Sequence, residues 1–314
     1  MMSETNSTLQ LTSSSSSTYR LYRHRFYIIA VFGLLAFNQC FIWLTFSPIA
    51  RSAEVYYNIT ESTVDLFLNW GNIVCIPTFP MAYLLLNKPQ GLRLSMIVFA
   101  VTSVVATALR IIPSLISSPT SNPHFSSIAV PFLHAGQILN AICAPLVQVP
   151  VSQLSCVWFG PNERARATTF ALMVNNFGAA VGFLISPLIV DVPEHVPHLL
   201  YVHLSLAILA CILTLIYFPA HPPLPPSPAA ERLLSYSISD NNTGFVRGFM
   251  NELWLCMKSP SFMLLSIVGG LTTGAFSAWT GLYDVILAPE NYTEEQAGKM
   301  MYQVDSYTSF LSFC

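Results

Sequence analysis

Charged residues are scarce in this sequence. Only 9% of the 314 residues are Asp, Glu, Lys or Arg, whereas soluble domains contain about 25%. Hydrophobic residues make up 53% and aromatic residues 12%. A chain of this composition lacks the polar side chains that would cover a soluble surface. The formal net charge of −2 and the lack of a basic patch give no indication of nucleic-acid binding.

Motifs of catalysis and metal binding are also missing. The sequence holds no nucleotide-binding loop, zinc-protease helix, nucleophile elbow or catalytic carboxylate pair in an exposed domain. Its 7 cysteines contain no C-x-x-C pair, and most fall within or beside apolar runs, so we interpret them as small core residues. We therefore expect a protein that is not an enzyme and that needs neither a metal nor a cofactor.

What the sequence does have is long apolar runs. A bilayer core about 30 Å thick is crossed by a helix of about 20 apolar residues. Seven runs of about this length with few charges cover residues 26–50, 64–86, 92–112, 131–157, 167–190, 199–218 and 262–288. Lipid offers the backbone no hydrogen-bond partners, and the runs do not alternate as barrel strands do. The sequence predicts an all-α, multi-pass membrane protein.

Basic residues predict the orientation of the runs, because Lys and Arg gather in cytosolic loops. With a cytosolic N-terminus, all 13 Lys and Arg residues except Arg51, Arg110 and Lys299 lie on the cytosolic side. The charges of "PNERARAT" then hold the loop between the fourth and fifth runs in the cytosol. This orientation disfavours a seven-helix receptor, which needs an external N-terminus. It places the glycosylation candidates Asn58 and Asn291 outside.

The order of the segments indicates how the chain is divided. We expect a disordered N-terminus over 1–25, a six-helix lobe over 26–218, a Pro-rich cytosolic linker over 219–260, a seventh helix over 261–288 and a polar tail over 289–314. Six helices, a linker and a further helix are typical of transporters built from two six-helix halves. The segment "PAHPPLPPS" should be polyproline II, either a spacer or a docking site for a proline-reading domain.

Polar side chains inside the runs are the candidate binding residues, because such residues usually face the bundle interior or a water-filled path. They are Asn38, Gln39 and Trp43 in the first run, Gln137 and Asn140 in the fourth, Asn175 and Asn176 in the fifth, and Ser277 in the seventh. An aromatic ring beside amides suits a flat polar solute. Interhelical amide bonding around an ordinary core Trp fits the same residues equally well.

Two titratable residues are candidates for proton coupling. His134 lies in the outermost turn of the fourth run, and an imidazole changes charge between about pH 5 and 8. Asp284 is the acid in the seventh run and could accept a proton or hold a cation. The alternatives are an interfacial histidine and an aspartate that snorkels to the outer surface.

Several motifs occur together in the order of a known family. The loop "LNKPQGLRL", the stretch "WFGPNERARATTFA" and the pattern W-x-G-x-x-D-x-I-L-x-P from Trp279 to Pro289 resemble solute carrier family 49 of the major facilitator superfamily. The resemblance implies the complete six-helix N-terminal half of a major facilitator bundle plus one helix of the second half. It implies transport of a small organic solute, with choline-like amines, pyridoxine and, by proposal, heme among the family's substrates. It also implies that Trp43 is a binding element.

The sequence departs from this family in ways that change the expected site. Ala144 and Ser277 stand where relatives carry a glutamine and a tyrosine, so a choline pocket is less expected than a pyridoxine-like ring. Lysosomal residence is implied by the resemblance, but the acidic dileucine signal is missing near the N-terminus, so the plasma membrane is the alternative. The tail after Pro289 departs as well, and we expect a truncated product.

Two hypotheses follow from the sequence. The first is a carrier of a small solute by alternating access, with or without coupled protons. The second is a truncated, transport-inactive membrane fragment with a binding or regulatory role, which associates with a full-length copy.

Overall fold

The structure, a computed structural model, describes residues 19–88, 90–117, 119, 124–239, 245–290 and 292–311. All regular secondary structure in these residues is helical, which confirms the predicted all-α class. The first part comprises α1 (His24–Trp43), α2 (Ala50–Tyr57), α3 (Glu61–Leu86), α4 (Gly91–Ile116), α5 (Phe125–Gln148), α6 (Pro150–Trp158), α7 (Arg164–Ile189) and α8 (Val196–Ile216). The second part comprises α9 (Pro228–Ser239), α10 (Phe245–Lys258), α11 (Pro260–Gly281), α12 (Tyr283–Leu287) and α13 (Glu294–Leu311).

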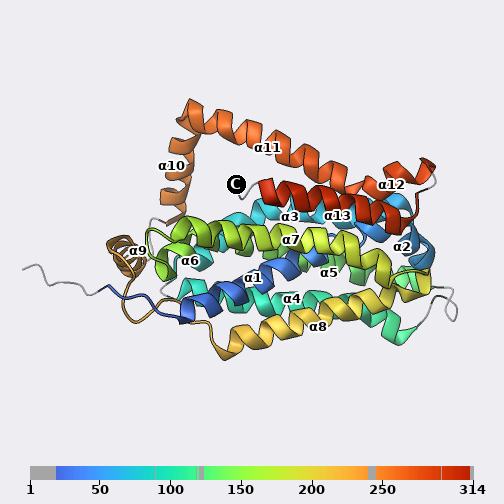
Figure 1. The fold of residues 1–314 in the computed structure, drawn as a ribbon, viewed down its shortest axis with the longest axis horizontal. Coiled ribbons are helices and arrows are strands. Elements are labelled where there is room, and N and C mark those ends of the chain that lie inside the picture. The colour runs from blue at the N-terminus through green and yellow to red at the C-terminus, as the bar shows by residue number, and fades with distance from the viewer. Residues whose placement is uncertain are drawn as a thin grey trace, which may run out of the picture.

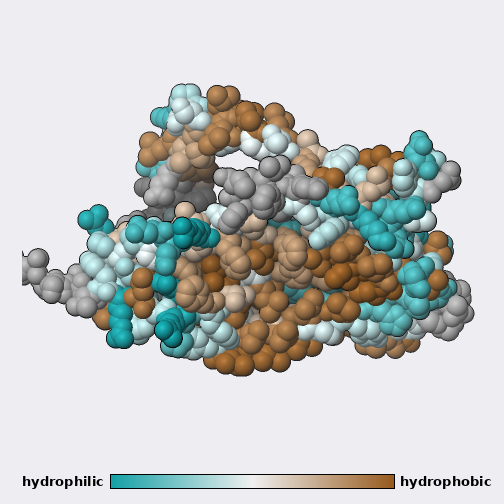
Figure 2. Space-filling model, in the orientation of Figure 1, coloured by the Kyte–Doolittle hydropathy of each residue, from teal (hydrophilic) through white to brown (hydrophobic). Residues whose placement is uncertain are grey.

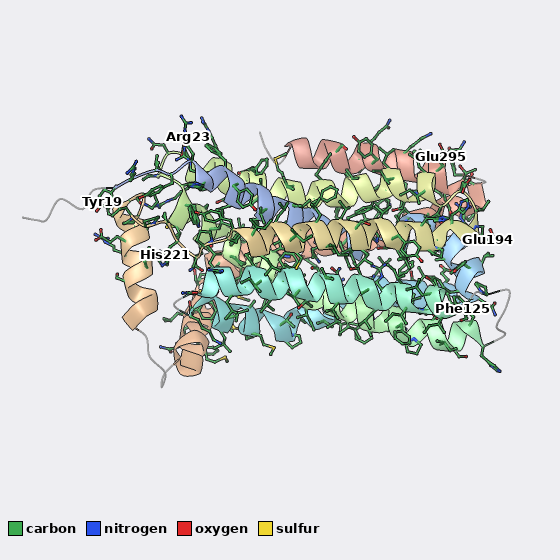
Figure 3. The ribbon with its side chains drawn as sticks, turned by 90° about the horizontal axis from the view of Figure 1, so that it is seen from below. Tyr19, Arg23, Phe125, Glu194, His221 and Glu295 are labelled. Atoms are coloured by element: carbon green, nitrogen blue, oxygen red, sulfur yellow. The ribbon has the colours of Figure 1, made fainter. Side chains whose placement is uncertain are left out.

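The long helices α1, α3, α4, α5, α7 and α8 lie side by side as one bundle (Figure 1). The closest neighbours are α4 with α5 and α8, α1 with α7, and α3 with α5. Figure 2 shows an apolar band over α7 and α8 between hydrophilic ends. Tyr19, Arg23 and His221 lie at one end and Phe125, Glu194 and Glu295 at the other (Figure 3). By the distribution of basic residues, the Arg23 end is the one expected to face the cytosol.

Six helical segments among the described residues are long and apolar enough to cross a membrane. They are His24–Tyr57, Gly91–Ile116, Phe125–Gln148, Arg164–Ile189, Pro193–Ile216 and Pro260–Gly281. The predicted run 64–86 is not among them, although α3 covers it as a helix of 26 residues. The polar residues Asp65, Asn69 and Asn72 lower the hydropathy of α3. A multi-pass membrane protein is confirmed.

Two of the predicted runs are broken where proline occurs, because proline donates no backbone hydrogen bond. The first run is not a single helix: α1 ends at Trp43, and Pro48 lies in the 3₁₀ turn Ser47–Ile49 that leads into α2. The fourth run is divided into α5 and α6, and Pro150 is the first residue of α6. Other prolines of the apolar runs lie inside continuous helices, namely Pro77, Pro80, Pro145 and Pro187.

Glycine brings α1 and α7 together. A Cβ atom at Gly178 would lie 2.3 Å from the carbonyl oxygen of Phe37, and one at Gly182 would lie 3.1 Å from the ring of Phe41. The G-x-x-x-G spacing in α7 is therefore a close helix contact, as is typical of this motif in membrane helices. At Gly270 in α11, by contrast, no atom of the residues that the structure describes lies within 4 Å of an added Cβ atom.

The charged loop after α6 ties the cytosolic end together. Arg25 Nη1 lies 2.9 Å from Glu163 Oε2, and Arg164 Nη2 donates to Ser227 Oγ at 2.5 Å. The backbone N–H of Arg20 donates to the carbonyl oxygen of Pro225 at 3.3 Å. The Pro-rich segment thus packs onto the bundle, which supports its role as a spacer. Docking of a proline-reading domain stays a prediction.

The C-terminal segment forms a helix that the sequence analysis did not expect. α13 packs along α7, and a Cβ atom at Gly298 would lie 2.3 Å from the carbonyl oxygen of Phe183. Ala297, Met301 and Asp305, each four residues apart, form its buried face. A helix that buries only one narrow face has too few apolar residues to appear as an apolar run in the sequence. In α11, by contrast, Thr280 is the buried residue and the remainder is largely exposed.

Candidate functional site

A cavity of about 260 Å³ lies where the bundle meets α11. Residues of α1, α3 and α11 line this cavity. Its polar or aromatic lining residues are Trp43, Asp65, Asn69, Asn72 and Ser277. Small-molecule sites in proteins typically measure about 300–1,000 Å³. At about 260 Å³ the cavity lies just below this range, so it suits only a small solute. It lies between the six-helix bundle and α11, the helix that follows the linker.

Trp43 is the last residue of α1 and is held firmly at this cavity. Its indole Nε1 donates to the carbonyl oxygen of Leu68 in α3 at 3.0 Å. Gly71 makes room for the ring, because a Cβ atom there would lie 2.7 Å from the indole Nε1. The ring position is thus fixed before any solute arrives, which lowers the entropy cost of stacking against it.

The predicted amides of α5 and α7 bind the backbone of α1. Gln137 Nε2 donates to the carbonyl oxygen of Trp43 at 3.3 Å, and Asn140 Nδ2 donates to that of Gln39 at 3.2 Å. Asn175 Nδ2 donates to the carbonyl oxygen of Ala36 at 2.7 Å. These bonds hold α1, α5 and α7 together, which supports the interpretation as interhelical amide bonding.

The other predicted residues have separate positions. Asn38 is fully buried, and among the described residues neither polar atom of its side chain has a hydrogen-bond partner. Gln39 is buried beside Asn175, whose Nδ2 also donates to Gln39 Oε1 at 3.4 Å. Asn176 is exposed. The structure therefore brings Trp43 and Ser277 together at the cavity, and the six amides predicted with them do not line it.

Three cavity residues of α3 were missed by the sequence analysis. Asp65, Asn69 and Asn72 are spaced by four and three residues and so share one face of α3. Gln137 and Asn140 in α5 are likewise three residues apart, so a comparison of spacings in the sequence would have found this face of α3. Asp65 gives the cavity a carboxylate, which is the natural partner of a cationic solute.

His134 is engaged by another aromatic residue. Its Nδ1 accepts a hydrogen bond from Trp70 Nε1 at 2.8 Å, and its ring centroid lies 4.6 Å from that of Phe67. An Nδ1 that accepts from Trp70 carries no proton of its own. Protonation of this atom therefore requires the Trp70 bond to break.

Asp284 forms an ion pair and does not reach outward to solvent. Its carboxylate accepts from Arg51 Nη2 at 2.6 Å and Nε at 3.1 Å. The Asp284 side chain is 3% exposed and that of Arg51 is 38% exposed. Beside this pair, Glu294 accepts from the Ser52 N–H at 2.8 Å and from Ser52 Oγ at 2.6 Å. We call these two pairs the outer clasp, since they join α2 to α12 and α13 at the outer end.

Glu294 lies at the start of α13, outside the membrane-crossing segments. Burial raises the pKa of its carboxyl above the usual value, and the hydrogen bonds from Ser52 act in the opposite direction. Because burial is the larger effect, protonation of Glu294 is easier in the folded protein than in the unfolded chain.

The remaining site predictions concern glycans and metals. Asn58 is exposed directly after α2, where its φ of 49° ends the helix in the left-handed conformation. Asn291 lies outside the described residues. Among the residues that are described, no group of three or more His, Cys, Asp or Glu side chains is arranged to hold a metal ion.

Comparison with known protein families shows the class of protein to which the chain belongs. The family described as Major Facilitator Superfamily matches residues 32–301, and the chain belongs to this superfamily. The fold is accordingly part of a major facilitator bundle.

Within the superfamily, the chain is similar to members of solute carrier family 49, as the sequence motifs predict. It is 30% identical over 299 residues to the solute carrier family 49 member 4 homolog of Xenopus tropicalis, covering 89% of this chain and 60% of that protein. It is 27% identical over 285 residues to solute carrier family 49 member A3 of Xenopus tropicalis, covering 89% and 55%. It is 27% identical over 286 residues to the choline/ethanolamine transporter FLVCR1 of Felis catus, covering 88% and 48%.

The chain thus spans about 60% of the length of the member 4 homologs that it matches. The relatives are named as solute carriers and transporters. This confirms the prediction that the chain is not an enzyme.

Proposed function

We propose that the chain acts in the transport of a small organic solute by alternating access, with the cavity of Trp43, Asp65 and Ser277 as the solute site. The observation that carries the proposal is the position of this cavity. It lies between the six-helix bundle and α11, and two-half transporters bind their solutes where the halves meet.

The lining favours a small aromatic or amine-bearing solute. Trp43 offers a ring for stacking or for contact with a cation, Asp65 offers a negative charge, and Asn69 and Asn72 offer hydrogen bonds. A choline-like amine or a pyridoxine-like ring matches this chemistry, and a relative is named as a choline/ethanolamine transporter. A heme-sized macrocycle needs a wider cavity than about 260 Å³.

Proton coupling, if present, involves groups that must first release their partners. Asp284 accepts a proton only after Arg51 withdraws, and His134 only after Trp70 withdraws. Each of these pairs joins two different helices, so proton uptake would be linked to a movement that separates them. We propose residence in the lysosomal membrane or the plasma membrane, with the Arg23 end in the cytosol.

Flux measurements test this proposal. Vesicles containing the chain are compared for movement of labelled pyridoxine and labelled choline with the variants Trp43→Ala and Asn69→Ala. Asn176→Ala is the matched control, because Asn176 is an exposed amide away from the cavity. We expect lower flux for the cavity variants and unchanged flux for the control. Equal rates for Trp43→Ala and the unchanged chain would remove Trp43 from the site.

The second candidate is a membrane protein that binds the solute without transporting it, or that regulates a full-length copy. The exposure of α11 favours it, since Thr280 is the buried residue of this helix in the part of the chain that the structure describes. Trp43-dependent binding of labelled solute with no flux would support this candidate over the carrier.

A further inference from the structure

Helix α10 lies across the direction of the membrane helices, at the cytosolic end (Figure 1). It ends at Lys258, and the membrane-crossing helix α11 begins at Pro260, so Ser259 alone separates them. A helix joined so closely to the cytosolic end of a membrane span must lie at the depth of the lipid headgroups.

One face of α10 is apolar, and no residue in the part of the chain that the structure describes covers it. Met250, Leu253, Trp254 and Met257 fall at steps of three and four residues and so share a face. Their exposed fractions are 55%, 41%, 55% and 49%, respectively. The main contact of α10 is with α11. Four large apolar side chains at this depth require an apolar environment, which the acyl boundary of the leaflet provides.

The adjoining face of α10 is polar and basic. Asn251 and Lys258 are seven residues apart and share this face. Lys258 Nζ lies 5.3 Å from the centroid of the Trp254 ring. Trp residues favour the membrane interface, and Lys side chains reach from there to the phosphates. The cytosolic leaflet carries negative charge, which complements this basic face.

We propose that α10 is an interfacial helix that binds the cytosolic leaflet. Its face of Met250, Leu253, Trp254 and Met257 inserts at the headgroup and acyl boundary, while Lys258 contacts lipid phosphates. The helix anchors the end of the linker on the bilayer beside the start of α11. This inference concerns membrane contact and does not depend on the proposed transport.

Depth measurements at one position on the apolar face and one on the basic face test the insertion. Spin labels are placed at Leu253→Cys or at Asn251→Cys in the whole chain with its own cysteines replaced, in phosphatidylcholine vesicles. We expect the label at 253 to collide several-fold more with oxygen than with a water-soluble nickel reagent, and the label at 251 to show the reverse. Equal exposure of both labels to the nickel reagent would overturn the proposal. A label at 253 shielded from both reagents would also overturn it, because protein would then cover the face.

A second comparison tests the contact with phosphates. Adding phosphatidylserine should move the label at 253 deeper when Lys258 is present, and this shift should be lost in Lys258→Gln. An equal depth with and without phosphatidylserine in the chain that retains Lys258 would overturn the electrostatic part. Asn251, Leu253 and Lys258 are all exposed positions of α10, so the thermal unfolding temperature should stay unchanged and serves as the folding control.

Discussion

The ion pair of the outer clasp should respond unequally to loss of its two partners. Arg51→Ala leaves the carboxylate of Asp284, which is 3% exposed, without its partner. Breaking a buried pair in this way costs about 3 kcal/mol. Asp284→Asn leaves Arg51, which is 38% exposed and can turn toward water, so the cost should be about 1 kcal/mol. The difference of about 2 kcal/mol is about thirtyfold in the unfolding equilibrium.

The assay is the free energy of unfolding in mixed detergent micelles for the unchanged chain, the two single variants and the double variant. The double variant removes both charges and should cost little more than Asp284→Asn, so the cycle should give a coupling energy of about 3 kcal/mol. If the effects of the two substitutions on the free energy of unfolding are additive, with coupling below about 0.3 kcal/mol, the reasoning is refuted. An Asp284→Asn variant less stable than Arg51→Ala would refute it as well.

Three further predictions concern other contacts. Gly178→Ala should lower the free energy of unfolding by about 2 kcal/mol through overpacking, while the matched Gly270→Ala should be neutral or slightly stabilising, as measured in the same micelles. Gly71→Ala should displace the Trp43 ring, which lies 2.7 Å from the added Cβ atom, and should alter tryptophan fluorescence without unfolding. Because the pKa of Glu294 is raised, its contribution to stability is greatest below about pH 4 and is lost as pH rises through the raised pKa. Glu294→Gln should flatten this part of the Tm profile, and an unchanged profile would contradict the assignment.

The helices of the bundle could be predicted because bilayer thickness imposes a run length that the sequence displays directly. The breaks at Trp43 and Pro150 could not be located from hydropathy, since the residues on both sides of each break are equally apolar. α13 was missed for a related reason. Its buried face is one residue in four, and the remaining positions are polar enough to resemble a loop.

The candidate site was predicted in part, and the misses have physical causes. Trp43 and Ser277 lie at the cavity, but periodicity shows which residues share a face without showing which face another helix covers. Gln137 and Asn140 therefore looked like cavity residues, although their amides bind the backbone of α1. The pairing of Arg51 with Asp284 joins residues 233 positions apart, and no local pattern connects them.

Equilibrium binding of labelled pyridoxine and choline to the purified chain in detergent tests the central claim most directly, because it does not require flux. If the cavity between α1, α3 and α11 is the solute site, Trp43→Ala should weaken binding by about two- to thirtyfold, the range of ring contacts worth about 0.5–2 kcal/mol. Asn176→Ala should bind as the unchanged chain does. Binding of equal strength in Trp43→Ala and Asn176→Ala would contradict the account.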